Sequence, residues 1–532
     1  MNDESSFPRA NSLGLVPAKA EKIPILAVAP VAVVAGAKLL IHLLLSNRYG
    51  YFRDELYYLD CGRHLSWGYV DHAPMIGLVA RIALLLSGGL PLLPALRVFP
   101  AVAGALLVAL TMVMTCRLGG DRFAQGLAGL SVLLVPIYLG IDSFLSMNAF
   151  EPLFWMGCIY FLIRIIQTGN SRLWIWFGVL AGLGLMNKHS TAFFGVAVVI
   201  GLLLTEHRRE FVKPWIWLGG GVALLIFLPN LLWQIQHHFP TLEDLHNVQV
   251  TGKNVVLSPL KFVLQQFVVM HPVLSLIWIS GLWHFLLGRG TRYRALAWIY
   301  LTFFVLMVVL HGKDYYVVPI YPMLLAGGAV AWEGALSRWR FTEGKLWPKA
   351  LVVGVVIITG AILAPLMLPL LSPDAYVTYM RKLGLTPTKR EVHEHAQWPQ
   401  VFADQFGWPE MVGQVAKVYI GLTPEERAKT AILTGNYGEA GAIDMFGPKY
   451  GLPPALSGHQ TYFYWGTHGF TGDNLITLQY GLDDLSRMCD SVEEVGVHFD
   501  PWGMEEENQP IYFCRGLKRP LAETWPQYKH WN

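Results

Sequence analysis

Long apolar stretches, separated by short polar segments, dominate the chain from residue 24 to residue 372. A helix needs about 20 mostly apolar residues to cross a bilayer. Many of the stretches approach this length, so the pattern predicts about eleven membrane-spanning helices. The predicted spans cover residues 24–46, 98–116, 123–141, 149–167, 173–187, 191–205, 214–233, 262–287, 295–310, 316–335 and 349–372.

The charges between these spans alternate along the chain. If the N-terminal tail, residues 1–23, is cytoplasmic, every predicted inside loop carries at least two Lys or Arg, as the positive-inside rule requires. An odd number of spans then places everything after residue 372 outside the cell membrane. The predicted inside loops are 117–122, 164–172, 207–213, 289–294 and 338–349, and the outside loops are 47–97, 142–148, 188–190, 234–261 and 311–315.

The first outside loop, residues 47–97, is too long for a simple turn. Its polar part, YFRDELYYLDCGRHLSWGYVDHAP, spans residues 51–74, and an apolar stretch too short to cross a membrane follows it at 75–86. We predict two helices lying in the membrane interface, the first holding residues 53–55 and the second following Pro74.

From residue 373 onward the composition becomes polar, with Pro and Gly throughout. The segments 431–435 and 510–516 have the pattern of strands, and 438–447 has that of a helix. We predict a small α/β domain over 373–532 on the outer face. Its two cysteines, at positions 489 and 514, could form a disulfide or remain buried thiols, and the sequence does not favour either.

Composition supports an integral membrane protein. Hydrophobic residues make up 54% of the 532 residues and charged residues 14%, which is more apolar surface than a soluble protein can cover. The net charge of +3, with basic residues only in short clusters, argues against a nucleic-acid partner. The expected fold class is therefore an α-helical polytopic membrane protein with a small C-terminal α/β domain.

Charged residues gather next to the bilayer in the segment 51–74, where they are costly unless they pair or act. Asp54 or Glu55 could act as a general base at the membrane surface. The alternative for both is a helix cap supported by a salt bridge, since acids favour the first turn. Arg53 belongs to the same cluster and is a candidate ligand of the substrate.

Two further motifs place polar residues at predicted outer ends of helices. Asp71 and His72 precede a proline, and the histidine could carry a proton or bind a phosphate, although a simple turn is the alternative. Glu151 lies at the outer end of the fourth span, where it either faces a polar cavity or caps the helix.

Two lysines depart from the positive-inside pattern. Lys188 is followed by His189, and Lys313 lies close to Tyr315, both in predicted outer loops. An anionic ligand at the outer surface would explain the lysines, because an ammonium group binds phosphate as a point charge. Snorkelling toward lipid head groups is the alternative.

Four motifs in this order resemble the bacterial branch of the C-type glycosyltransferases. They are RDELYYLDCGRHLSWGYVDHAP, SMNAFEPLFW, NKHS and GKDYYVVPIYPMLLAGGAVAWE. That branch includes the relatives of dolichyl-phosphate-mannose–protein mannosyltransferases and the aminoarabinose transferases that modify lipid A. The resemblance covers residues 24–372, and the segments NYGEAGAIDMFG and LPPALSGHQTYFYWG are similar to the outer domain of one bacterial subgroup.

The resemblance implies an enzyme in the cell membrane that takes a sugar from a polyprenyl-phosphate carrier. The acceptor would be a hydroxyl or amine of a lipid, glycan or protein on the outer face. Asp54 matches the catalytic carboxylate of these enzymes, Glu55 its companion acid, and Glu151 a position where relatives often have Asp. The aminoarabinose transferases carry Glu-Lys-Pro-Pro where this chain has residues 71–74, so a histidine replaces the lysine that grips the donor phosphate. Lys188 or Lys313 then becomes the expected main cation.

Two matters stay open at this point. Some C-type enzymes use a divalent metal, and Asp54, Glu55 and Glu151 offer oxygen ligands, but no spacing demands a metal or any other cofactor. A secondary transporter or flippase for a lipid or sugar phosphate would also need outer lysines and buried charges. Such transporters often contain repeated halves, and no repeat is visible here.

Overall fold

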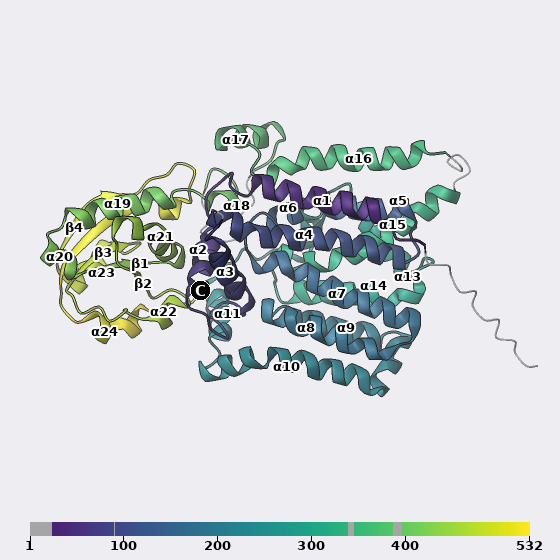
Figure 1. The fold of residues 1–532 in the computed structure, drawn as a ribbon, viewed down its shortest axis with the longest axis horizontal. Helices are drawn as coiled ribbons and strands as arrows, with labels where there is room; N and C mark the ends of the chain where they lie inside the picture. The colour runs from purple at the N-terminus through teal and green to yellow at the C-terminus, as the bar shows by residue number, and fades with distance from the viewer. Residues whose placement is uncertain (1–23, 90, 339–344, 387–395) are drawn as a thin grey trace, which may run out of the picture.

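The structure is a computed structural model and describes residues 24–89, 91–338, 345–386 and 396–532. Figure 1 shows a bundle of long, roughly parallel helices with a sheet-containing domain at one end. This arrangement confirms the predicted fold class. The predicted tail, residues 1–23, lies outside the described residues.

Seven helical segments in the described part of the chain are long and apolar enough to cross a membrane, or eight if α9 and η2, bent by 112°, form one span. Shorter helices occupy the other predicted positions, so the expected number of about eleven spans includes several that are short. The helices of the bundle are α1 (Val28–Leu45), α4 (Leu92–Arg117), α5 (Arg122–Leu134), α6 (Pro136–Ile141), α7 (Met147–Thr168), α8 (Trp174–Asn187), α9 (Thr191–Leu203), η2 (Glu206–Val212), α10 (Pro214–Gln236), α12 (Pro259–Val269), α13 (Ser275–Leu286), α14 (Arg294–Val309), η4 (Asp314–Ile320), α15 (Tyr321–Arg338) and α16 (Trp347–Leu363).

Proline divides two of the predicted spans. The prediction of one helix over 262–287 is wrong, because α12 ends at Val269 and α13 begins only at Ser275. His271, directly before Pro272, has a φ of 73°, which is outside the helical region. The span predicted over 123–141 is divided in the same way, since Val135 adopts an extended conformation before Pro136.

Small residues allow the bundle helices to approach closely. A Cβ atom added to Gly281 of α13 would collide with the backbone of Leu324 on α15, and one added to Gly328 of α15 would collide with the backbone of Ile277. Such contacts are typical of helix pairs in membranes, where packing replaces the hydrophobic driving force.

Loops that the charge pattern assigned to the same side contact one another. At one end of the bundle, Arg292 donates a hydrogen bond of 2.9 Å to the carbonyl oxygen of Ile166. At the opposite end, which faces the sheet domain, the amide of Asn187 donates to the carbonyl oxygen of Met147 at 2.9 Å. The predicted outer loops therefore lie at the end of the bundle that faces the C-terminal domain (Figure 1).

The two predicted helices of the first outer loop are present as α2 (Arg53–Arg63) and α3 (Met75–Leu86). They pack against each other, and at Gly62 an added Cβ would lie 2.8 Å from the backbone nitrogen of Arg81. Most of α2 is buried although its sequence is polar. The reason is that α2 lies between the bundle and the C-terminal domain, so neither of its faces is free (Figure 1).

The C-terminal part contains a five-stranded sheet of order β2-β1-β3-β5-β4 within the described residues. β1 pairs in parallel with β2 and β3, whereas β5 is antiparallel to β3 and β4. The predicted strands and helix agree with β1, β5 and α21 to within a residue. The strands are β1 (Thr430–Thr434), β2 (Ala455–Ser457), β3 (Asn474–Leu478), β4 (Cys489–Val497) and β5 (Pro510–Leu517).

The helices around the sheet connect it to the bundle. α21 contacts α2, and a disulfide joins Cys489 of β4 to Cys514 of β5, which decides between the two alternatives that the sequence left open. The other helices of this region are α11 (Pro240–Thr251), α17 (Pro373–Lys382), α18 (Gln400–Ala403), α19 (Trp408–Gly421), α20 (Pro424–Ala428), α21 (Tyr437–Phe446), α22 (Tyr462–Trp465), α23 (Leu482–Met488) and α24 (Leu521–Thr524).

Candidate active site

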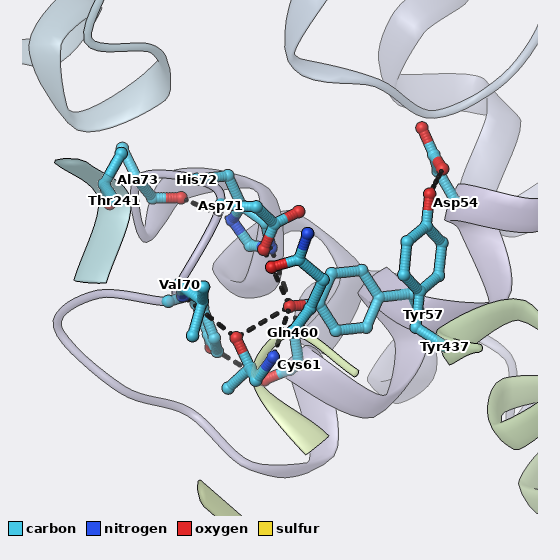
Figure 2. A network of polar contacts seen from close by, with 12 residues as sticks. Asp54, Tyr57, Cys61, Val70, Asp71, His72, Ala73, Thr241, Tyr437 and Gln460 are labelled. Atoms are coloured by element: carbon cyan, nitrogen blue, oxygen red, sulfur yellow. Dashed lines mark hydrogen bonds and ion pairs between the residues drawn. The ribbon is translucent and has the colours of Figure 1, made fainter. Parts of the chain in front are cut away.

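Asp54 lies in the first turn of α2 and is half-buried. The hydroxyl of Tyr437, from the C-terminal domain, donates a hydrogen bond of 2.8 Å to its Oδ1 (Figure 2). The ring of Tyr437 stacks on that of Tyr57, with the centroids 4.8 Å apart. The predicted base, Asp54, is therefore hydrogen-bonded by Tyr437, a side chain of the C-terminal domain.

Glu55, the next residue, is fully buried and saturated with donors. Arg97 of α4 donates to both carboxylate oxygens, at 3.0 Å from Nε and 2.7 Å from the terminal nitrogen. The backbone amides of Phe52 and Leu145 donate to the same carboxylate, each at 2.9 Å. These contacts favour a structural function for Glu55 over the companion-acid function that the sequence suggested.

Arg53 points toward the C-terminal domain. One terminal nitrogen lies 2.7 Å from Glu506 and the other 3.7 Å from Asp404, and the guanidinium lies 5.8 Å from the centre of the Tyr437 ring. Arg53 therefore joins α2 to this domain through ion pairs, which argues against the substrate-binding function predicted for it.

Asp71 extends the polar network beyond Tyr57. The Tyr57 hydroxyl lies 2.8 Å from Asp71 Oδ1 (Figure 2). It also lies 2.7 Å from the hydroxyl oxygen of Thr461 in the C-terminal domain. Burial raises the pKa of Asp71 from 3.8 to about 7, because the charged form loses hydration. Asp71 can therefore exchange a proton near neutral pH.

His72 is buried and packed among aromatic rings. Its Nδ1 lies 2.9 Å from the carbonyl oxygen of Ala73, its Nε2 lies 3.7 Å from the Cys61 sulfur, and the Tyr69 ring centroid is 4.6 Å away. Burial lowers the pKa of His72 to about 4, so the ring is neutral at physiological pH. A neutral buried imidazole is poorly suited to the phosphate contact expected at this position.

Glu151 and Lys188 form an ion pair of 3.1 Å at the same end of the bundle. The Lys188 ammonium also donates to Asn148 at 2.8 Å and lies 4.7 Å from the centre of the Tyr316 ring. Ser190 donates to the other oxygen of Glu151. The glutamate is buried, but 17% of the Lys188 side chain is exposed. Glu151 therefore orients and neutralises a lysine that an anion can still approach.

His189 connects this pair to the first loop. Its Nε2 lies 2.9 Å from the side-chain oxygen of Asn230, whose amide donates to the Trp67 carbonyl at 2.8 Å. Burial lowers the pKa of His189 despite the opposing hydrogen bond with Asn230, and the nearby His72 also lowers it.

Lys313 and Tyr315 flank the start of η4 and are half-buried. The rings of Tyr315 and Tyr316 meet edge to face with their centroids 5.0 Å apart. Since the neighbouring Tyr316 faces Lys188, this segment borders the same part of the bundle.

The structure thus brings residues from four predicted outer loops to the end of the bundle that the C-terminal domain covers. Sequence reasoning missed Tyr437 and Arg97. Tyr437 occurs in the tail motif NYGEAG, but nothing in the sequence pairs it with α2. Arg97 was detectable in principle, because it is a further cation in a predicted outer loop.

Asp54, Glu55 and Glu151 are the oxygen ligands that the sequence offers to a metal ion. In the part of the chain that the structure describes, no group of three or more His, Cys, Asp or Glu side chains is arranged to hold a metal ion. Glu55 and Glu151 each use their oxygens for protein donors. These carboxylates therefore do not fit a shared metal site, and we derive no step through a metal.

Comparison with known proteins gives an independent view of the fold. Residues 71–233 match the family model described as dolichyl-phosphate-mannose-protein mannosyltransferase. The chain is 26% identical over 353 residues to the lipid A galacturonosyltransferase RgtD of Rhizobium johnstonii, a match that covers 64% of this chain and 72% of RgtD.

Two crystal structures of ArnT from Cupriavidus metallidurans share the fold, one in the apo state and one bound to undecaprenyl phosphate. Each superimposes with a TM-score of 0.57 at 15% sequence identity, covering 92% of this chain and 98% of ArnT. This agreement includes the C-terminal domain as well as the helix bundle.

The fold and these matches define a multi-pass membrane glycosyltransferase with the C-type architecture. Within that class, the findings support the group that the sequence motifs resemble, the relatives of protein mannosyltransferases and of ArnT.

Proposed function

We propose that this enzyme transfers a sugar from a polyprenyl-phosphate carrier to a hydroxyl or amine on the extracytoplasmic face of the membrane. Residues 24–372 would form the transmembrane catalytic domain, the N-terminus would be cytoplasmic, and residues 373–532 would form an outer domain. The relatives support the donor and acceptor classes: one ArnT structure contains undecaprenyl phosphate, and RgtD acts on lipid A. A lipid or glycan acceptor is therefore favoured over a protein.

One observation carries the assignment of the base. Of the three acids predicted for catalysis, Glu55 and Glu151 are buried, whereas Asp54 is half-buried beside Tyr437. Asp54 is thus the acid best placed to reach a substrate. A positioned carboxylate that removes a proton from a poor nucleophile contributes about 10²–10⁴-fold in rate.

The reaction balances without an additional reactant. The acceptor O–H or N–H bond gives its proton to Asp54 while the acceptor atom attacks the anomeric carbon of the sugar. The bond from that carbon to the phosphate oxygen breaks, and its electron pair leaves with the polyprenyl phosphate. Lys188 offsets the negative charge that grows on this oxygen, which is the charge development that fixed cations stabilise best. Lys313 is the second candidate cation.

The test uses membranes that contain the full chain, undecaprenyl-phosphate-linked radiolabelled galacturonic acid or mannose, and lipid A as acceptor. We expect labelled lipid A with wild type and at least a 100-fold loss with Asp54→Asn at equal expression. Glu55→Gln serves as the matched acid control. Equal product from wild type and Asp54→Asn would refute Asp54 as the base. Movement of donor across the bilayer without transfer would favour the transporter.

A further inference from the structure

The C-terminal domain inserts one side chain into the candidate active site. Tyr437 is the first residue of α21, and its hydroxyl oxygen lies 2.8 Å from Asp54 Oδ1, across 383 positions of sequence. Figure 2 shows the two side chains approaching each other from different elements of the fold. The contact is a phenol-to-carboxylate hydrogen bond, which is stronger than a bond between neutral groups.

The ring of Tyr437 has little freedom to turn away. It stacks against the Tyr57 ring, with the centroids 4.8 Å apart and the planes at 30°, and against the His459 ring, at 4.9 Å and 28°. The Arg53 guanidinium lies 5.8 Å from its centre. Stacking against two rings restricts the plane of the phenol, so its oxygen is held at Asp54 before any substrate arrives.

The backbone that carries Tyr437 is equally constrained. The Asn436 side chain accepts hydrogen bonds from the backbone amides of Gly438 and Glu439, at 2.8 and 3.0 Å, which fixes the first turn of α21. An added Cβ at Gly441 would lie 2.9 Å from the backbone of Leu56 on α2. The close contact between α21 and α2 therefore determines where the hydroxyl lies.

We propose that Tyr437 is a positioning residue for the base, so that the active site is complete only when the C-terminal domain is docked on α2. This inference rests on the proposed function, in which Asp54 removes the acceptor proton. The hydroxyl holds the carboxylate oriented toward the acceptor and favours its ionised form, because a hydrogen bond donated to the charged form of an acid lowers its pKa.

Burial raises the pKa of Tyr437 itself, and the negative charge of Asp54 raises it further, so the phenol remains a donor. Other titratable groups also act on Asp54. They are Arg53 and Tyr58 on α2, Asp71 and His72 in the following loop, and Asp404 in the C-terminal region. All of these groups remain when only the Tyr437 hydroxyl is removed, so the difference between wild type and Tyr437→Phe isolates one hydrogen bond.

The control is a second interdomain tyrosine. Tyr462 on α22 donates its hydroxyl hydrogen bond to Asp60, which also lies on α2. Tyr462→Phe therefore removes a phenol-to-carboxylate bond across the same interface without touching Asp54. Both variants keep the aromatic ring, and a thermal melt in detergent checks that both remain folded.

The experiment measures kcat/KM between pH 5 and 9 for wild type, Asp54→Asn, Tyr437→Phe and Tyr462→Phe, with the substrates named above. Tyr437→Phe should shift the midpoint of the acid limb of the kcat/KM profile to higher pH by about one unit. At pH values below that midpoint kcat/KM should fall about tenfold, and the KM for the donor should not change. Tyr462→Phe should keep the wild-type limb.

The possible failures are distinguishable. If Asp54→Asn is inactive but Tyr437→Phe superimposes on wild type, the positioning function is refuted and the proposed function stands. A loss in Tyr437→Phe that is matched by an equal loss in Tyr462→Phe at every pH also refutes it, since the loss then comes from the interface and not from the bond to Asp54. If Asp54→Asn is as active as wild type, both proposals fall.

Discussion

The buried pair of Glu55 and Arg97 offers a sharp test of how the first outer loop is held. Arg97 contributes two hydrogen bonds to the carboxylate, and it also donates to the carbonyl oxygens of Ser46 and Gly50, at 2.9 and 2.7 Å. The pair therefore joins α4, the end of α1 and the start of α2. We expect this pair to stabilise the first turn of α2, which carries Asp54, without taking part in the reaction.

The magnitude follows from the donors that each substitution leaves behind. Arg97→Met leaves a buried carboxylate without its cation, a change that typically costs about 3–5 kcal/mol. Glu55→Gln replaces one acceptor oxygen by an NH₂ group that faces donors, and each buried donor left unpaired costs about 1–3 kcal/mol. The double variant should cost less than the sum of the two, because neither charge is then left without its partner.

The assay combines stability with activity. The midpoint temperature at which the purified variants lose their monodisperse elution peak reports stability, and transfer is measured per folded molecule well below that temperature. Glu55→Gln should melt earlier and yet retain activity within about tenfold of wild type, whereas loss of a catalytic base costs about 10²–10⁴-fold. Glu333→Gln is the control, since Glu333 accepts hydrogen bonds from the backbone amides of Asp121 and Ala124 at the opposite end of the bundle. A Glu55→Gln protein with wild-type stability and a 100-fold loss of transfer would refute the reasoning.

Three further outcomes are expected. Lys188→Met should weaken binding of undecaprenyl phosphate, measured by native mass spectrometry, at least about tenfold, because it removes the cation beside Glu151. Lys188→Arg should bind more tightly than Lys188→Met, because it keeps the positive charge. Unchanged binding in Lys188→Met would exclude Lys188 as the phosphate ligand. The folded-state pKa of Asp71 is raised from 3.8 to about 7, so its stabilising contribution is complete below about pH 4 and is lost as the pH rises to about 7. Asp71→Asn should therefore flatten the dependence of melting temperature on pH in that window, and an unchanged slope would contradict the assignment. Reduction of the Cys489–Cys514 disulfide should destabilise the C-terminal domain by about 2–5 kcal/mol. Limited proteolysis across a denaturant series measures this change, and cleavage of the domain at the same denaturant concentration before and after reduction would argue against it.

Much of the architecture could be predicted because it depends on local patterns. Apolar runs located the bundle helices, and Pro74 correctly separated α2 from α3. The division of α12 from α13 was missed because the apolar run continues through the break. Only the backbone at His271 and the missing amide hydrogen of Pro272 interrupt the helix there.

The candidate site was predictable only in part. Asp54, Glu151 and Lys188 stand out because charge is rare beside apolar spans. Which charges neutralise each other depends on the packing of distant helices, so the pairing of Glu55 with Arg97 could not be derived from spacing. The same holds for Tyr437, whose approach to Asp54 requires both α21 and α2 to be in place.

The position of α2 between two partners has a consequence for how such enzymes can diversify. α2 packs against the helix bundle on one side. Three of its residues, Arg53, Tyr57 and Asp60, bond to the C-terminal region. A chimera that receives only the C-terminal domain of a relative would lose these contacts at once. Exchange of the C-terminal domain between relatives should therefore require α2 to be transplanted with it, because the two form one structural unit that crosses the predicted boundary at residue 372.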